Sequence, residues 1–235
     1  MENSCLNLDL GATSYENAMD IQSKFQALVR WKKLTNILLT LEHPHIITIG
    51  KTGSNKDIKI SQEAISDANV QIVRTNRGGK VTYHGPGQLI VYPIINLREL
   101  NLGPQKYIFK IEETIIRTLN KFGVKGGRSV GNHGVWVKDA KIAAIGVKIS
   151  QGISSHGFSI NLNPNLSYFD FIVPCGIPDK SVCSLDSLGV TAIDSNYFKD
   201  TLIKNFSSVF DLSIKTCSTD EIKHMYNIKH NITCT

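Results

Sequence analysis

The sequence predicts an α+β fold with a mixed, mostly antiparallel β-sheet flanked by helices, which we expect to cover one side of it. Apolar residues recur at helical spacing in three well-separated segments, and short apolar runs bounded by turn residues lie between them. The order helix, strands, helix, strands, helix is typical of helices packed on a sheet. The 235 residues contain neither a repeat nor a linker, so we expect one domain over residues 1–235.

The composition narrows the class of protein. Hydrophobic residues make up 41% of the chain and charged residues 20%, which excludes a disordered chain or a coiled coil. No apolar stretch reaches the roughly 20 residues that a membrane-spanning helix needs. The N-terminus lacks the pattern of a secretory or transit peptide. We therefore expect a cytoplasmic protein with no membrane partner.

The cysteines indicate a reducing compartment and no metal site. They are few, odd in number and scattered, which favours reduced thiols over a disulfide framework. No Cys/His spacing fits a structural zinc site. The cysteines are Cys5, Cys175, Cys183, Cys217 and Cys234.

Local signals predict the elements of the first half of the chain. Thr13 and Glu16 form a capping-box pair, and the apolar spacing behind them predicts a helix of about 18 residues. The strand-like runs 36–41 and 45–49 flank Glu42-His43-Pro44, which predicts the turn of a hairpin. The next predicted elements are a loop with a short helix over 51–69, a short strand over 70–73 and a buried strand over 89–97.

Helices and strands are also predicted in the second half of the chain. Pro104 suits the first turn of a helix that runs to Phe122. The spacing of apolar residues predicts another helix from Ser195 to Phe210, and Ser218 with Glu221 predicts one more short helix in the tail. Between the two long helices we expect strands over 134–137, 142–149 and 156–162, and a loop over 163–180. Residues 211–235 form a tail with little diagnostic pattern.

The segment Arg77–Gln88, RGGKVTYHGPGQ, is the first candidate functional site. It holds four glycines, a proline, two basic residues, a tyrosine and a histidine between two predicted strands. A hairpin turn needs two or three special residues, so this density favours a loop whose backbone approaches a ligand closely. Neither the phosphate-binding nor the dinucleotide-binding glycine motif is present.

Two single residues are further candidates. Lys141 opens the run KIAAIG in an otherwise apolar strand, where a lysine usually reaches out to water. Cys175 lies between Pro174 and Gly176, a constrained setting that favours a presented nucleophile over a buried inert thiol. A thiolate needs a nearby cation to lower its pKa, and Lys141 and His84 are the natural candidates.

These segments together resemble a known family. RGGKVTYHGPGQLIVYPI, KIAAIGVKIS, HGFSINLN and the PCGI loop followed by SLDSLG are similar to the lipoyl(octanoyl) transferases of protein lipoylation. The resemblance runs from the first helix to Leu188. It implies the fold of the lipoate and biotin ligase catalytic domains. It also implies an acyltransferase that moves an octanoyl or lipoyl group from acyl carrier protein to a lysine.

The resemblance also implies partners and site residues. The acceptors would be lipoyl domains of 2-oxoacid dehydrogenase E2 subunits and the glycine-cleavage H protein, and no cofactor would be needed. Cys175 would be the acyl-carrying nucleophile, Lys141 would tune it, and His84 would point towards the thioester carbonyl. The substrate-binding residues would be Arg77, Gly78, Gly79, Lys80, Val81, Thr82, Tyr83, His84, Ala144, Ile145, Gly146, Gly157, Phe158 and Ser159.

Three other hypotheses remain at this point. An ATP-dependent lipoate or biotin ligase on the same fold would activate a free acid and would need no cysteine. The net charge of +6 also fits a nucleic-acid-binding domain, but the aromatic residues lie in apolar strands rather than among exposed basic residues. A catalytically dead scaffold is the third, and the presence of both Cys175 and Lys141 argues against it.

Overall fold

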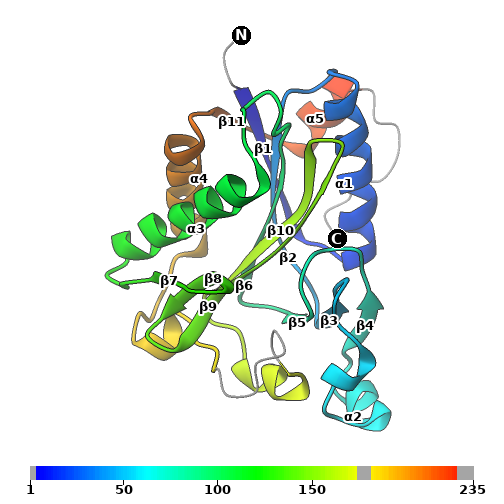
Figure 1. The fold of residues 1–235 in the computed structure, drawn as a ribbon, viewed down its shortest axis with the longest axis vertical. Helices are drawn as coiled ribbons and strands as arrows, with labels where there is room; N and C mark the ends of the chain where they lie inside the picture. Colours follow the sequence, from blue (N-terminus) through cyan, green and yellow to red (C-terminus); the bar gives the residue numbers. More distant parts are fainter. Residues whose placement is uncertain (1–3, 174–180, 227–235) are drawn as a thin grey trace.

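The computed structural model describes residues 4–173 and 181–226, built around two β-sheets (Figure 1). The larger sheet has eight strands in the order β11-β1-β2-β6-β10-β9-β8-β7, and the smaller has the order β4-β3-β5. The pairs β1–β11, β1–β2 and β3–β4 are parallel, and the other named pairs are antiparallel. The predicted mixed, mostly antiparallel α+β class is thus confirmed.

The strands have the following bounds. Those of the larger sheet are β1 Ser4–Ala12, β2 Ile37–Glu42, β6 Gln88–Ile94, β7 Gly127–Ser129, β8 Asn132–Val137, β9 Ala140–Ser150, β10 Ile153–Asn161 and β11 Ser213–Cys217. Those of the smaller sheet are β3 Ile46–Ile49, β4 Gln71–Arg74 and β5 Val81–His84. The helices are α1 Tyr15–Arg30, α2 Gln62–Asp67, α3 Pro104–Lys121, α4 Ser195–Phe210 and α5 Thr219–Tyr226.

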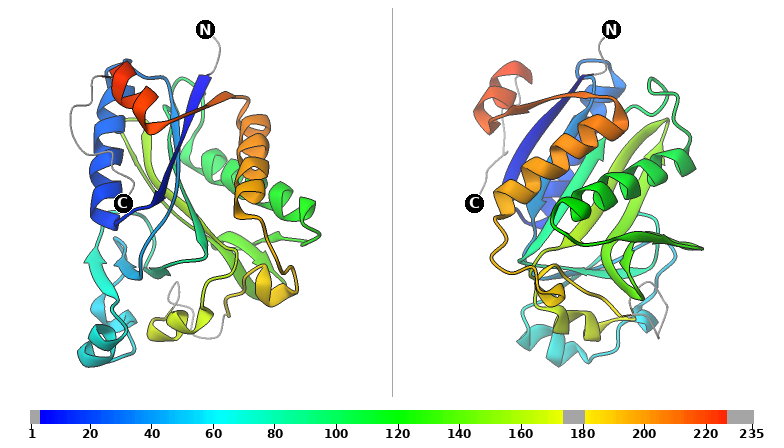
Figure 2. Two further views of the ribbon diagram at one scale, coloured as in Figure 1. Left: turned by 180° about the vertical axis from the view of Figure 1, so that it is seen from behind. Right: turned by 90° about the vertical axis from the view of Figure 1, so that its left-hand side faces the viewer.

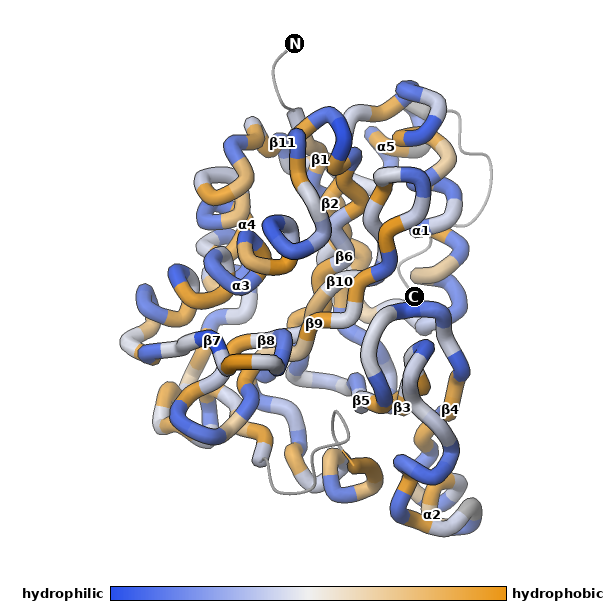
Figure 3. The backbone as a smooth tube through the Cα atoms, in the orientation of Figure 1, coloured by the Kyte–Doolittle hydropathy of each residue, from blue (hydrophilic) through white to orange (hydrophobic). Residues whose placement is uncertain are grey.

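Helices cover both faces of the larger sheet, so the expectation that they lie on one side was wrong. Figure 2 shows α1 and α5 on one side of the strands and α3 and α4 on the other. The apolar residues divide accordingly: Phe25 of α1 packs in one core and Tyr107 of α3 in another. The central strands supply apolar side chains to both cores, and Figure 3 shows how hydrophobic these strands are. A sheet buried on both faces needs a helical layer on each.

The start of α1 differs from the predicted capping box. Ser14 is the N-cap, and its side chain accepts a hydrogen bond from the backbone N–H of Asn17. Thr13 is buried instead, with its hydroxyl donating to the carbonyl of Leu10 at 2.8 Å. Thr13 is therefore bound to the preceding strand, which leaves the next hydroxyl residue to cap the helix.

The predicted hairpin over 36–49 was also wrong. β2 belongs to the larger sheet and pairs with β1 and β6, whereas β3 pairs with β4 and β5 of the smaller sheet. His43 lies in the connection, where its Nδ1 is 2.6 Å from the carbonyl oxygen of Thr13 and its Nε2 is 2.8 Å from the Tyr92 hydroxyl. Buried hydrogen bonds thus fix the connection between the two sheets at the position where the turn of a hairpin was expected.

Four strands were missed, namely β1, β5, β7 and β11, and the other long elements were predicted well. β1 and β11 pair with each other in parallel, which brings both ends of the described chain to one edge of the sheet. The predicted capping pair Ser218 and Glu221 is confirmed by reciprocal hydrogen bonds at the start of α5. None of the helices in residues 4–173 and 181–226 combines the length and apolar character needed to cross a membrane.

Candidate functional site

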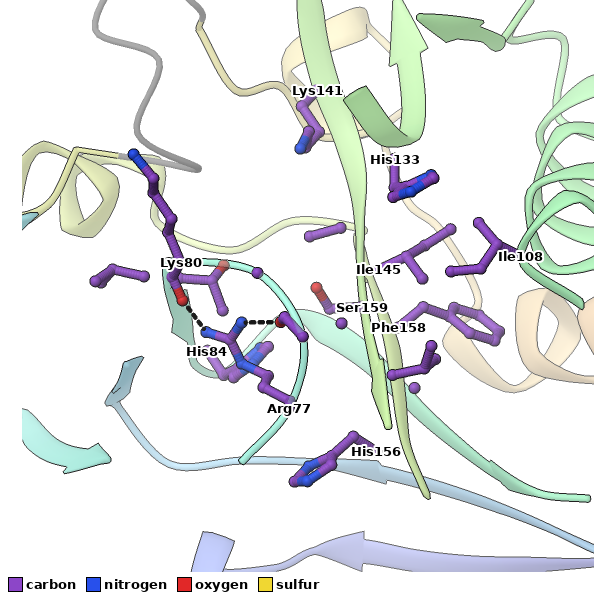
Figure 4. Close-up of a pocket in the computed structure, with 18 of the residues that line it drawn as sticks. Arg77, Lys80, His84, Ile108, His133, Lys141, Ile145, His156, Phe158 and Ser159 are labelled. Atoms are coloured by element: carbon purple, nitrogen blue, oxygen red, sulfur yellow. Dashed lines mark hydrogen bonds between the residues drawn. The ribbon is translucent and has the colours of Figure 1, made fainter. Parts of the chain in front are cut away.

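A cavity of about 340 Å³ lies between the glycine-rich segment and strands β9 and β10 (Figure 4). Its volume falls in the range of small-molecule sites. Most residues predicted for the site line it together, although the glycine-rich segment is far in sequence from the β9–β10 hairpin. They are Arg77, Gly78, Gly79, Lys80, Val81, Thr82, His84, Lys141, Ala144, Ile145, Gly146, Gly157, Phe158 and Ser159.

Two predicted residues are not part of the described lining. Tyr83 alternates with its neighbours along β5 and points into the core of the smaller sheet, where its ring stacks on Tyr168 at 5.0 Å. Its hydroxyl lies 2.7 Å from Nδ1 of His45. Cys175 lies outside the described residues. Its neighbours along the chain are described as far as Val173 and again from Ser181.

Arg77 holds the glycine-rich segment against β3. The residue is only 7% exposed, and its guanidinium donates to the carbonyl and hydroxyl oxygens of Thr48 at 2.7 and 2.9 Å. It also donates to the carbonyls of Gly78 and Lys80 of its own loop, each at 2.9 Å. Planar guanidinium donors suit such convergent carbonyls. Arg77 therefore shapes the pocket wall as well as lining it.

Two positions in the site require glycine for different structural reasons. Gly79 has a φ of +84°, a conformation that other residues adopt at a cost. At Gly157 a Cβ atom would lie 1.9 Å from the carbonyl oxygen of Val91 on the neighbouring strand β6. Gly157 is thus required by close strand packing, whereas Gly79 is required by a tight turn of the loop.

Lys141 is a buried cation at one end of the pocket. Its side chain leaves β9 beside Trp136 of β8, and Nζ lies 4.7 Å from the centre of the indole ring. The residue is 8% exposed. A cation over an aromatic face is stabilised where water is largely excluded. The predicted lysine at a strand mouth is therefore held in the site rather than extended into solvent.

The backbone of Lys141 also binds the chain that follows the PCGI segment. Its N–H donates to the carbonyl of Ser181 at 2.9 Å, and its carbonyl accepts from the N–H of Cys183 at 3.0 Å. Residues 181–183 therefore run alongside β9 at the lysine. This pairing joins two segments that are about forty residues apart in sequence, which no local pattern predicts.

Two buried histidines, His84 and His156, line the site, and the ring centre of buried His43 lies 6.1 Å from that of His84; all three are neutral at physiological pH. Burial, reinforced by His43 and Arg77, lowers the pKa of His84 to about 3. Burial, with the positive charges of Arg77 and Lys148, lowers the pKa of His156 to about 4. Burial lowers the pKa of His43 to about 4 despite its hydrogen bond to Thr13. The site thus combines neutral imidazoles with the guanidinium of Arg77 and the amine of Lys141.

His156 carries unusual backbone geometry. It sits within β10 with a φ of +52°, and its N–H donates to the Oε1 atom of Gln22 at 2.7 Å. Its ring lies 2.7 Å from Oδ1 of Asn76, next to Arg77. A non-glycine residue in this conformation stores strain that the surroundings must hold, as is common at ligand sites.

Several lining residues were not predicted from the sequence. Those on α1, α3, β6 and β9 have the apolar spacing of core residues, whereas those in the segment after β3 and in the β7–β8 hairpin show no distinguishing local pattern. The missed residues are Tyr15, Thr52, Ile90, Tyr92, Ile108, Gly131, Asn132, His133, Val147 and His156. In the described part of the chain, no group of three His, Cys, Asp or Glu side chains could hold a metal ion.

The fold is shared with solved lipoate and biotin ligases. A bi-partite lipoate protein ligase from Thermoplasma acidophilum superposes with a TM-score of 0.72, at 14% identity, over 96% of this chain and 90% of that one. A biotin protein ligase from Aquifex aeolicus in complex with biotin and ATP gives a TM-score of 0.54, at 13% identity, over 88% and 70% of the two chains. At such low identity the likeness concerns the fold alone.

Sequence comparison identifies closer relatives. The octanoyltransferase of Solibacter usitatus is 41% identical over 214 residues, covering 91% of this chain and 96% of the relative. The octanoyltransferase of Caldicellulosiruptor bescii is 39% identical over 227 residues, covering 95% and 100%. The family model of the lipoyl protein ligase A/B catalytic domain matches residues 14–207. On this evidence, the chain belongs to the octanoyltransferase family, with the lipoyl protein ligase A/B catalytic domain at residues 14–207.

Proposed function

We propose that this protein transfers an octanoyl group from acyl carrier protein to the ε-amine of a lysine on a lipoyl domain, through a thioester on Cys175. The observation that carries the proposal is the pocket itself. Apolar side chains of β9, β10 and α3, among them Ile145, Phe158 and Ile108, line the same cavity as the buried side chain of Lys141. An acyl thioester has the same division into an apolar chain and a polar reactive end.

The pocket offers specific surfaces to an acyl chain. The loop 77–82 supplies mostly backbone and small side chains on one side, and Ile145 and Phe158 supply apolar surface on the other. Each methylene that leaves water contributes about 0.8 kcal/mol to binding. Because Lys141 lies at one end of these surfaces, we propose that the chain extends away from it towards Tyr15 and His156.

The chemistry requires a thiol and a proton acceptor. In the first step, the Cys175 thiolate attacks the carrier thioester, its bond to the acyl carbon forms, and the carrier thiolate leaves. In the second step, the neutral amine of the acceptor lysine attacks the same carbon, and the bond to Cys175 breaks as the amide forms. The Lys141 ammonium would stabilise the Cys175 thiolate and give its proton to the leaving carrier thiolate. The resulting neutral Lys141 amine would take up the proton of the acceptor amine in the second step, as Cys175 leaves as a thiolate, so that both groups return to their starting states. His84 completes the proposed catalytic group.

Intact-mass analysis tests the thioester. After incubation with octanoyl-acyl carrier protein and no acceptor, we expect the mass of one octanoyl group on the protein, removed by hydroxylamine. Cys175→Ser should abolish the adduct, and Cys183→Ser should leave it. An octanoyl group on Cys183 or Cys217, or on a lysine, would contradict the assignment of Cys175.

A second measurement tests Lys141. Lys141→Ala should slow transfer by roughly 10²–10⁴, the range typical of general acid–base groups. It should also raise the pH at which Cys175 becomes alkylated, because the neighbouring positive charge is lost. An unchanged alkylation profile would exclude the pKa-tuning role. An assay with free octanoate and ATP in place of octanoyl-acyl carrier protein tests for the activity of a ligase. Octanoylation of the lipoyl domain under those conditions would overturn the proposed donor.

A further inference from the structure

A line of buried polar side chains runs from His84 in the pocket to the segment beside Lys141. Nδ1 of His84 lies 3.1 Å from Oε1 of Gln88. The Nε2 group of Gln88 donates to Oδ1 of Asn161 at 3.0 Å, and Nδ2 of Asn161 donates to the carbonyl of Cys183 at 2.9 Å. The three side chains are 8%, 1% and 5% exposed, so water competes little for these bonds.

Adjacent strands hold the two amides in register. Gln88 begins β6 and Asn161 ends β10, and the two residues are direct partners in the antiparallel ladder. Side chains of opposed residues lie close enough to interact across such a pair. The backbone of Asn161 is fixed as well, since its carbonyl accepts from the N–H of Leu185 at 3.1 Å. The line is therefore built into the sheet.

Backbone carbonyls at two points fix the direction of every hydrogen bond in the line. The carbonyl of Cys183 can only accept, so Asn161 must present its NH₂ group there and its oxygen to Gln88. Gln88 must then present its NH₂ group to that oxygen and to the carbonyl of Tyr83, which lies 3.3 Å away. The reversed amides would place pairs of acceptors in contact, which is unfavourable where water is excluded.

This direction determines where the imidazole proton lies. The oxygen of Gln88 is left facing His84, so Nδ1 of His84 must carry a hydrogen and donate it. The lowered pKa of His84, about 3, keeps the ring neutral, so Nε2 carries no proton. We infer that Gln88 and Asn161 hold His84 in the Nδ1–H tautomer, so that the Nε2 lone pair faces the acyl pocket as a hydrogen-bond acceptor.

An acceptor at this position has a specific use, which rests on the proposed function. It gives no hydrogen bond to the thioester carbonyl, so His84 does not act there as a donor. The acyl chain carries no N–H group, whereas the incoming lysine amine does. By accepting one amine hydrogen, Nε2 orients the nitrogen lone pair towards the acyl carbon, and with its low pKa it carries no proton away. Gln88 and Asn161 are then positioning residues for the second step.

The direct test is the ring nitrogen spectrum of His84 in the intact protein. In protein labelled with ¹⁵N-histidine, the chemical shifts of the ring nitrogens report which nitrogen carries the proton. Signals that disappear in a His84→Gln variant are assigned to His84. We expect a protonated Nδ1 and an unprotonated Nε2 that stay unchanged between about pH 5 and 8. A ring protonated on Nε2, or one that titrates near pH 6.5, would overturn the inference.

Variants of Gln88 separate tautomer control from a merely structural role. Gln88→Leu removes the acceptor and should shift His84 towards the Nε2–H form that imidazoles favour in water. If Gln88→Leu does not fold, Gln88→Glu is the second variant. Its buried carboxyl in the protonated form can still donate to Asn161 and offers its other oxygen to His84, so Nδ1 of His84 should remain protonated. Asn36→Leu is the matched control, because Asn36 is also a buried amide bonded to backbone but lies outside the pocket. Loss of the Nδ1–H form in Gln88→Glu would refute the assigned direction.

Kinetics distinguish the two proposals. In Gln88→Leu, acylation of the enzyme should stay within about threefold of wild type, and transfer to the lipoyl domain should slow by about tenfold or more, as expected for one lost hydrogen bond. Equal slowing of both steps would refute the role in amine orientation. If wild-type protein formed no octanoyl thioester, the proposed function would fail, but the spectrum would still decide the tautomer.

Discussion

Replacing Arg77 tests whether one buried guanidinium holds the wall of the acyl pocket. In Arg77→Met, the carbonyls of Thr48 and Gly78 lose the guanidinium donor, whereas that of Lys80 keeps the backbone N–H of Gly50. A buried acceptor left unsatisfied costs about 1–3 kcal/mol. Water can enter from the pocket side and satisfy part of the loop, so we expect the free energy of unfolding to fall by about 3–5 kcal/mol, comparable to breaking a buried ion pair.

Urea denaturation monitored by fluorescence and circular dichroism measures this loss, with an unchanged m-value as the sign that stability alone has changed. Arg77→Lys retains the charge but not the planar donors, and we expect roughly half the loss. The matched control is Arg74→Met, which removes the same charge from an exposed position on β4 and should change stability by less than about 0.5 kcal/mol. Equal losses in Arg77→Met and Arg74→Met would refute the idea that the guanidinium anchors the loop.

Three further predictions follow from burial and close packing. Gly157→Ala should destabilise the protein by about 3 kcal/mol or more, because its Cβ would meet the Val91 carbonyl at 1.9 Å; Gly127→Ala, with nothing within 4 Å, is the denaturation control. Burial raises the pKa of Cys183 to about 11. In the folded protein its alkylation at pH 7.5 should therefore be at least roughly hundredfold slower than that of an ordinary thiol. Mass mapping that found Cys183 labelled before the other cysteines would contradict this expectation. The pKa values of His43, His84 and His156, about 4, 3 and 4, lie below the ordinary value of 6.5, so the unfolded chain binds more protons between those limits. Stability should therefore be constant above about pH 6.5 and fall on acidification by up to about 1.4 kcal/mol per pH unit for each histidine, and denaturation curves that coincide at pH 7 and pH 5 would refute it.

Local patterns in the sequence determined much of this protein. Pro104 and the apolar spacing behind it predicted α3, and the spacing over 195–210 predicted α4 with its observed bounds. Both helices bury a single stripe, which periodicity reports directly. The density of glycines from Arg77 onwards and the break in the apolar run at Lys141 marked two walls of the pocket, because each departs from the rules that build ordinary turns and strands.

Only the tertiary structure decided how these segments meet. The run over 36–49 has the local pattern of a hairpin, but its two strands pair more favourably with β1 and β6 and with β4 and β5, so the chain divides between two sheets. Tyr15 and Ile108 match the apolar spacing of their helices, and only the packing of those helices shows that they reach the cavity. The position of the His84 proton depends on carbonyls of Tyr83 and Cys183, about a hundred residues apart. Periodicity reports which face of an element is buried, whereas register between distant strands determines which atoms that face meets, and the chemistry of the site depends on those atoms.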